Sequence, residues 1–197
     1  MYANRGGGNN SYVYWGTSTG FSTTSRTDLP TVSAVDVKAA DIDADGHVDL
    51  AFANGSGTSS YVYWGSATGF TTTARDSLPT TNPGDVELGD IDSDGHTDIV
   101  FSNYTKSPYV YWGSATGFHI TSVTGLSTAG YATDTSLYDI NGDGYLDVAV
   151  SRDVLGPSSA GYYSSSKIFW GTSSGVSLTG VTDIPSVEAR AIKIVGK

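Results

Sequence analysis

The sequence predicts an all-β protein of the β-propeller type, built from four-stranded antiparallel blades, with four blade units in the chain. An Asp/Gly-rich segment of nine residues recurs at intervals of 49 residues, and an aromatic segment recurs at nearly the same interval. Between them lie short runs of strand-forming residues, and no stretch shows a sustained helical period. Four short strands repeated every ~49 residues are typical of propeller blades.

The Asp/Gly-rich segment reads DIDADGHVD at 41–49, DIDSDGHTD at 90–98 and DINGDGYLD at 139–147. Each copy places acidic or amide side chains at positions 1, 3, 5 and 9 and glycine at position 6. Such oxygen-rich loops suit calcium, and the glycine allows the left-handed turn that lets the carboxylates converge. We therefore predict three Ca²⁺ ions per chain. The candidate side-chain ligands are Asp41, Asp43, Asp45 and Asp49; Asp90, Asp92, Asp94 and Asp98; and Asp139, Asn141, Asp143 and Asp147.

An Asp/Gly-rich turn without metal is the alternative interpretation of each loop. Three copies in register argue against it, because the loops hold 11 of the 20 acidic residues of the chain. Without a cation, each loop would crowd three or four like charges into a small volume, at a cost in repulsion.

The aromatic segment occurs as near copies at 11–21, 60–70 and 108–118, and as a looser copy at 167–176. Strand alternation places Tyr61 and Tyr63 on one face of the sheet, and Val62 and Trp64 on the other. About ten additional residues precede the last copy, and we interpret 152–166 as a lengthened hairpin loop.

We expect residues 1–197 to form one domain, with units at 33–80, 84–128 and 132–185 and a split unit formed by 186–197 plus 1–31. In the first unit the expected strands are 35–40, 50–53 and 61–64, with a fourth that begins at 70–74. Small residues near the end of the first strand suit an innermost position around a central channel. These small residues are Ala39, Ala40 and Gly89.

The two ends of the sequence complement each other. The tail matches a first strand and the head matches a second and a third, so we expect 187–194 to lie innermost in the blade that contains 12–15. Closure within one chain would give four blades, which we favour, and closure between two chains would give eight. Lys193 stands where Asp41 would be, so no fourth metal site is expected.

Bulk properties exclude several classes of function. The formal net charge of −10 argues against nucleic acid and anionic membrane surfaces as partners. The absence of cysteine excludes disulfides and thiolate metal sites. No stretch is long and apolar enough to span a membrane.

The three loops, each flanked by short apolar strands, resemble FG-GAP/VCBS-type repeats, the calcium-loop blades of integrin α-chain propellers and of many secreted bacterial and fungal proteins. The resemblance covers essentially the whole chain. It implies a β-propeller with Ca²⁺ between the first and second strands of a blade, and an extracellular or cell-surface location. It also implies that the position-7 residues His47, His96 and Tyr145 ligate through their backbone carbonyls.

This resemblance favours a secreted, calcium-stabilised binding module that recognises carbohydrate, as a lectin does. Aromatic side chains that could stack on sugar faces are the speculative ligand-binding set, although packing between blades is the ordinary role of such residues. The set comprises Tyr14, Trp15, Tyr63, Trp64, Tyr111, Trp112 and Trp170.

A protein-adhesion or assembly module that binds a cell-surface protein, with a possible homodimer, is the main alternative. We do not expect an enzyme. The chain has no cysteine nucleophile, and two of its three histidines, His47 and His96, repeat at one loop position. A polysaccharide-acting enzyme, or an accessory domain of one, remains a minor alternative.

Overall fold

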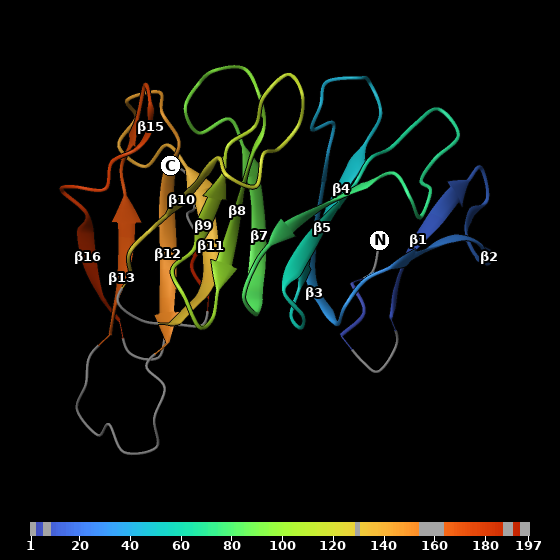
Figure 1. Ribbon diagram of the computed structural model, residues 1–197, viewed down its shortest axis with the longest axis horizontal. Coiled ribbons are helices and arrows are strands. Elements are labelled where there is room, and N and C mark those ends of the chain that lie inside the picture. The colour runs from blue at the N-terminus through green and yellow to red at the C-terminus, as the bar shows by residue number, and fades with distance from the viewer. Residues whose placement is uncertain (1–2, 6–8, 129–130, 154–163, 187–190, 194–197) are drawn as a thin grey trace, which may run out of the picture.

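A computed structural model describes residues 3–5, 9–128, 131–153, 164–186 and 191–193 of the chain. These residues form strands and turns, and no helix occurs among them. Three antiparallel four-stranded sheets stand side by side in the order of the sequence, with a hairpin at one end of the row (Figure 1). A second, shorter hairpin lies in a connection of the third sheet. The all-β prediction with four-stranded antiparallel units is therefore confirmed.

Each four-stranded sheet contains one copy of the Asp/Gly-rich loop, between its first and second strands. The first sheet consists of β3 (Ala34–Ala40), β4 (Asp49–Asn54), β5 (Ser59–Tyr63) and β6 (Arg75–Pro79). The second consists of β7 (Pro83–Gly89), β8 (Asp98–Asn103), β9 (Tyr109–Tyr111) and β10 (Val123–Gly125). The third consists of β11 (Tyr131–Tyr138), β12 (Asp147–Asp153), β13 (Ser164–Phe169) and β16 (Thr182–Ser186).

Two hairpins complete the described fold. One pairs β1 (Asn10–Thr17) with β2 (Gly20–Pro30), and the other pairs β14 (Gly171–Thr172) with β15 (Gly175–Val176). The β1–β2 hairpin lies at one end of the row of sheets, and the third four-stranded sheet lies at the other end (Figure 1). Closure of this row into a complete propeller stays a prediction.

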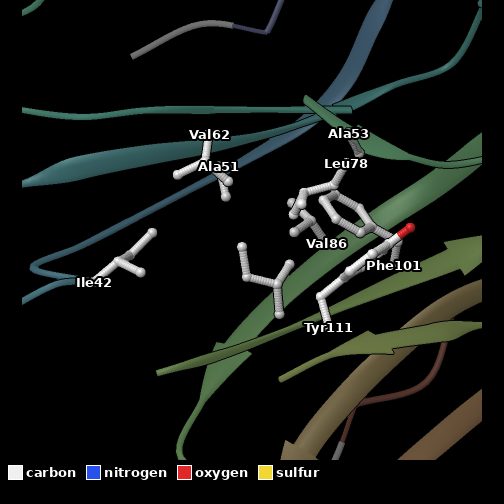
Figure 2. Packing of buried hydrophobic residues seen from close by; sticks show 9 residues of the cluster. Ile42, Ala51, Ala53, Val62, Leu78, Val86, Phe101 and Tyr111 are labelled. Atoms are coloured by element: carbon white, nitrogen blue, oxygen red, sulfur yellow. The ribbon is translucent and has the colours of Figure 1, made fainter. Parts of the chain in front are cut away.

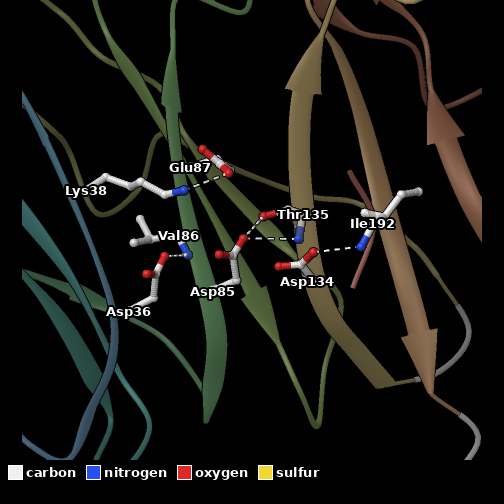
Figure 3. A network of polar contacts seen from close by, with 8 residues as sticks. All are labelled: Asp36, Lys38, Asp85, Val86, Glu87, Asp134, Thr135 and Ile192. Carbon is white, nitrogen blue, oxygen red and sulfur yellow. Dashed lines mark hydrogen bonds and ion pairs between the residues drawn. The ribbon is translucent and has the colours of Figure 1, made fainter. Parts of the chain in front are cut away.

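The first strands of the three sheets lie next to one another, with β7 between β3 and β11 (Figure 3). Aspartates at one repeated position link them. Asp36 Oδ2 accepts the Val86 N–H at 3.3 Å, and Asp85 Oδ2 accepts the Thr135 N–H at 3.1 Å and its hydroxyl at 2.6 Å. Because each carboxylate binds the backbone of the next sheet, the repeat fixes the offset between neighbouring sheets.

The same ladder continues beyond β11. Asp134 Oδ2 accepts the Ile192 N–H at 2.8 Å, so the described tail residues 191–193 lie beside β11 (Figure 3). No strand is assigned to these three residues. The rest of the expected inner strand 187–194 lies outside the described residues.

Apolar side chains fill the space between consecutive sheets. Figure 2 shows the cluster between the first and second sheets, in which Val62 and Leu78 of one sheet meet Val86 and Phe101 of the other. Tyr63 belongs to the cluster on the opposite side of its sheet, together with Val13 of β1. The predicted alternation of Val62 and Tyr63 across the two faces is therefore confirmed.

The prediction that the fourth strand begins at 70–74 is wrong, because β6 begins at Arg75. Phe70 instead stacks on Trp15 of the neighbouring hairpin, with ring centroids 5.9 Å apart. The Ala74 N–H donates to Thr71 Oγ1 at 3.2 Å, and this bond closes a turn where strand pairing was expected. Packing between sheets has overridden the local strand propensity of this segment.

Other predictions fall partly outside the described residues. β12 ends at Asp153 and β13 begins at Ser164, so most of the expected long loop at 152–166 is not described. The described strands of the three sheets fall within or next to the ranges expected for the three intact units. Within the described part of the chain there is no helix of the length and apolar character needed to cross a membrane.

Candidate functional site

The first two Asp/Gly-rich loops bring three carboxylates together at positions 1, 3 and 9. One oxygen from each of Asp41, Asp43 and Asp49 lies within 4.8 Å of the other two, and Asp90, Asp92 and Asp98 form the same cluster in the second loop. Oxygen atoms at this spacing can share one divalent cation. The carboxylates of Asp45 and Asp94 at position 5 are not part of these clusters.

The carboxylate at position 9 is held on both sides by backbone groups. Asp49 Oδ2 accepts the Ile42 N–H at 2.8 Å, and Asp49 Oδ1 accepts the Gly65 N–H at 2.7 Å. Asp98 and Asp147 make the same two bonds with Ile91 and Gly113, and with Ile140 and Gly171. All three carboxylates are buried, so each ties its loop to the turn after the third strand.

The turn after the third strand needs glycine, because its backbone passes very close to the backbone of the Asp/Gly-rich loop. A Cβ on Gly65 would lie 2.2 Å from the Val48 carbonyl oxygen, and Gly113 and Gly171 stand in the same relation to Thr97 and Leu146. The glycine of the repeated Trp-Gly pair therefore lets this turn approach the Asp/Gly-rich loop of its own sheet. Sequence reasoning missed this role, although the repetition of the glycine was the available signal.

Side-chain oxygens of the loop also cap its own backbone. Asp41 Oδ2 accepts the Gly46 N–H at 3.0 Å, and Asp45 Oδ1 accepts the His47 N–H at 2.8 Å. Gly46 has φ of 89° and Ala44 has φ of 61°, so positions 6 and 4 are both left-handed. The left-handed turn predicted at position 6 is confirmed. Ligation by the carbonyl oxygens of His47, His96 and Tyr145 stays a prediction.

Several carboxylates of the first two loops have pKa values raised above the ordinary range of aspartate. Burial raises the pKa of Asp98 to about 6, and the backbone N–H groups of Gly113 and Ile91 oppose that rise. Burial also raises the pKa of Asp49 and of Asp92, and the nearby Asp94 carboxylate adds to the effect at Asp92. A divalent cation would lower these pKa values, because it favours the ionised form of each carboxylate.

The third loop keeps the same backbone pattern with a different donor at position 3. The Asn141 side-chain amide donates to Asp143 Oδ2 at 2.9 Å, and Asn141 Oδ1 accepts the Asp143 N–H at 2.9 Å. Asp139 Oδ2 accepts the Gly144 N–H at 2.8 Å, as Asp41 does with Gly46. An amide oxygen is a suitable calcium ligand, so the residues present in all three loops fit a hard divalent cation.

Two of the aromatic residues in the speculative ligand-binding set are closed to ligands. Tyr63 is 0 % exposed and Tyr111 is 2 % exposed. Their hydroxyls donate to the backbone oxygens of Pro30 and Pro79 in the preceding sheet, at 2.5 Å in both cases. These tyrosines join neighbouring sheets, so their proposed contact with sugar is withdrawn.

The tryptophans of the set lie mostly between sheets. Trp64 stacks on Phe118 at 6.2 Å, and Trp112 packs directly over Gly175. The indole N–H of Trp112 donates to Thr124 Oγ1 at 2.9 Å, and that of Trp170 donates to Thr182 Oγ1 at 3.0 Å. Packing between strands and sheets accounts for these contacts without a ligand.

Tyr14 and Trp15 differ, because they line an apolar cleft of about 420 Å³ beside the first Asp/Gly-rich loop. The equivalent position next to Trp64 retains only about 10 Å³, where Ile42 from position 2 of that loop lines the space. Trp15 is 38 % exposed. These are the two residues of the speculative set that line this cleft.

A larger and more polar cleft lies at the opposite end of the sheets from the Asp/Gly-rich loops. It measures about 590 Å³, and its lining includes Arg5, Gly55, Tyr104 and Asp153. β3 runs from this cleft to the first metal loop, and β4 returns. Sequence reasoning did not find this cleft, because its residues are far apart in the chain and belong to no repeated motif.

The carboxylates between the first strands were also missed. Burial raises the pKa of Asp85 to about 8; the Thr135 hydroxyl opposes this rise, and the Asp134 and Asp36 carboxylates reinforce it. Burial raises the pKa of Asp134 as well. On β3 and β7, Lys38 Nζ and Glu87 Oε1 form an ion pair at 2.9 Å (Figure 3). The spacing of 49 residues between Asp36, Asp85 and Asp134 was the available signal.

Comparison with known families gives one assignment. The model of the FG-GAP-like repeat matches residues 41–101 and 90–150, and together the two matches span more than half of the chain. Each match begins at position 1 of an Asp/Gly-rich loop. The comparison with curated proteins found no match.

Proposed function

This chain belongs to the FG-GAP-like repeat family, and from that membership we propose that it is an extracellular, calcium-stabilised β-propeller module that binds carbohydrate. Repeats of this family suggest a β-propeller-type adhesion or binding module and are typical of extracellular proteins. The observation that supports calcium most directly is the convergence of the carboxylates at positions 1, 3 and 9 in two successive loops.

In this proposal calcium has a structural role. It neutralises the clustered carboxylates, and so it holds the connection between the first and second strands of each unit. The side chains of Asp41, Asp43 and Asp49 hold the ion in the first loop, and their counterparts hold it in the other two. The clefts lie on the framework that these loops hold in place.

Protein adhesion is the second candidate function. The β1–β2 hairpin at the end of the row exposes Phe21, which is 81 % accessible, and Trp15. Exposed aromatic residues are frequent anchors in protein interfaces. The same end of the row is where a second chain would complete an eight-bladed ring, so a homodimer belongs to this alternative.

A glycan array and a pull-down from cell-surface proteins, both run with calcium, separate the two candidates. Saturable binding to a defined group of glycans, abolished by EDTA, is the expected result. Capture of one cell-surface protein with no glycan bound would favour adhesion instead. Turnover of a polysaccharide under the same conditions would contradict our proposal that the chain is not an enzyme.

A further inference from the structure

Four equivalent positions of the four units meet in the polar cleft of about 590 Å³. Ala34 pairs with Asn54, Pro83 with Asn103, and Ala132 with Arg152, so Gly55, Tyr104 and Asp153 each follow an equivalent residue at the end of a second strand. The fourth position is Arg5, as the hydrogen bonds of Asn4 show.

Asn4 repeats the contacts of Asn54. The Asn4 N–H donates to Ser11 Oγ at 3.3 Å, and the Asn54 N–H donates to Ser60 Oγ at 3.2 Å. The side-chain amides of the two asparagines donate to the backbone oxygens of Asn10 and Ser59. Arg5 therefore occupies in its unit the place that Gly55, Tyr104 and Asp153 occupy in theirs.

The residue types at these four cleft positions differ from unit to unit, whereas the Asp/Gly-rich loops largely repeat theirs. One carries a guanidinium, one has no side chain, one carries a phenol ring and one carries a carboxylate. By contrast, positions 1, 5, 6 and 9 of the loops have the same residue in all three copies. The strand pairing is the same in each unit, so the backbone does not require different residues at these positions. Chemically different groups around one cleft suit an asymmetric ligand.

The bulges of the three first strands form another part of the same cleft. The pairing register shifts at Val35, Gly84 and Thr133, and all three residues line the cleft. Bulges re-aim side chains at functional sites. A Cβ on Gly84 would lie 2.5 Å from the Thr133 carbonyl oxygen, so glycine is needed where the second and third sheets approach each other.

We propose that this cleft binds a sugar that bears a carboxylate, a hexuronate residue of a glycan, with Arg5 as the partner of the carboxylate. This inference rests on the proposed carbohydrate-binding function and names its site and ligand class. Arg5 is exposed and makes no hydrogen bond or ion pair with any described residue, in a chain whose formal net charge is −10. A guanidinium binds a carboxylate through two parallel hydrogen bonds.

The other groups suit the rest of a pyranose ring. The Tyr104 ring can cover an apolar C–H face of the sugar. The carboxylate of Asp153, which is 7 % exposed, can accept hydrogen bonds from sugar hydroxyls, and the side chains of Ser33 and Asn82 add further polar groups at the rim. The volume falls in the range of small-molecule sites and accommodates one or two sugar rings.

The test compares methyl glucuronide and methyl galacturonide with methyl glucoside and methyl galactoside, which lack the carboxylate. Titration calorimetry is run on the full chain with calcium. We expect the uronides to bind and the neutral glycosides to bind at least tenfold more weakly. Equal binding of the charged and neutral sugars, or no binding of the uronides, would overturn the assignment.

Three variants locate the site. Arg5→Gln should weaken uronide binding at least tenfold, and Tyr104→Gly, which introduces the residue of the preceding unit, should weaken it several-fold. Lys106→Gln removes the same charge from an exposed position that does not line the cleft, and should change nothing. Arg5→Gln and Lys106→Gln should keep the melting temperature of the parent protein, because both side chains are exposed. Tyr104→Gly also removes the ring contact with Tyr131, whose centroid lies 5.3 Å away, so its melting temperature should fall while the fold is kept.

The outcomes distinguish this inference from the proposed function. If the glycan array shows binding but Arg5→Gln binds the uronides as tightly as the parent protein does, the site is wrong and the function stands. If neither the array nor the titration shows any glycan bound, both are wrong.

Discussion

The two ends of the sheets are built in opposite ways. At one end, three loops repeat the residues at positions 1, 5, 6 and 9. The carboxylate at position 9 is buried and accepts the same backbone hydrogen bonds in all of them. At the other end, the equivalent residues Arg5, Gly55, Tyr104 and Asp153 share a backbone position and no chemistry. Repetition therefore marks the framework of this molecule, and divergence on that framework marks the proposed recognition site.

The largest effect should come from removing a repeated buried carboxylate. Asp98→Ala leaves the N–H groups of Ile91 and Gly113 without their acceptor, so the free energy of unfolding should fall by about 3 kcal/mol. Urea denaturation in EDTA measures this effect apart from calcium. Asp94→Ala in the same loop is the matched control and should cost less than about 1 kcal/mol under those conditions, because Asp94 is exposed. Equal losses would show that burial at position 9 does not distinguish the two carboxylates.

The glycine that faces the loop should come next. Gly65→Ala places a methyl group against the Val48 carbonyl oxygen, and we expect a loss of about 2 kcal/mol in the free energy of unfolding. Gly125→Ala is the control, because its Cβ would meet only Tyr109 ring atoms at 3.7 Å or more. Thermal denaturation of both variants compares them, and a Gly65→Ala variant as stable as the parent protein would contradict the close approach.

Between the two ends, Asp85 should give stability a dependence on pH. Its folded-state pKa of about 8 lies above the ordinary value of 3.8, so between these pH values the folded protein holds a proton that the unfolded chain has released. Stability should therefore fall as pH rises through this window, by about 2 kcal/mol between pH 6 and 8. Asp85→Asn should remove this part of the slope, as unfolding measured at several pH values would show. An unchanged slope would mean that Asp85 is ionised in the folded protein.

The smallest effect concerns the one loop that departs from the repeat. Asn141→Asp adds a carboxylate at position 3 of the third loop, where the first two loops have one. Because calcium affinity rises with the charge of the ligand set, the third site should bind several-fold more tightly. Calcium titration of this variant, with the parent protein as control, checks the expectation. Weaker binding would show that the amide of Asn141 is needed for the hydrogen bond to Asp143.

The sequence was sufficient for the parts of the molecule that are local in the chain. Nine consecutive residues contain all the carboxylates of one Asp/Gly-rich loop, so the clusters of Asp41, Asp43 and Asp49 and of their counterparts in the second loop could be predicted from spacing. The strand alternation around Val62 could be predicted for the same reason.

Features that depend on how the sheets stand beside one another could not be predicted. The burial of Tyr63 depends on a contact with Pro30 in the preceding sheet. The polar cleft combines residues from 5 to 153, which meet only when the three first strands lie side by side. Phe70 does not belong to a strand as predicted, because it stacks on Trp15 of the neighbouring hairpin, which is distant in the sequence.

A calcium titration of the full chain, with the melting temperature recorded at each step, tests the central claim most directly. We predict three Ca²⁺ ions per chain and a melting temperature that rises with calcium and falls when EDTA removes it, because the ions bind the folded state. Asp90→Ala, which removes one of the three clustered carboxylates of the second loop, should lower the stoichiometry to two. A chain that binds no calcium and melts at the same temperature in excess EDTA would contradict the claim that these loops are calcium sites that stabilise the fold.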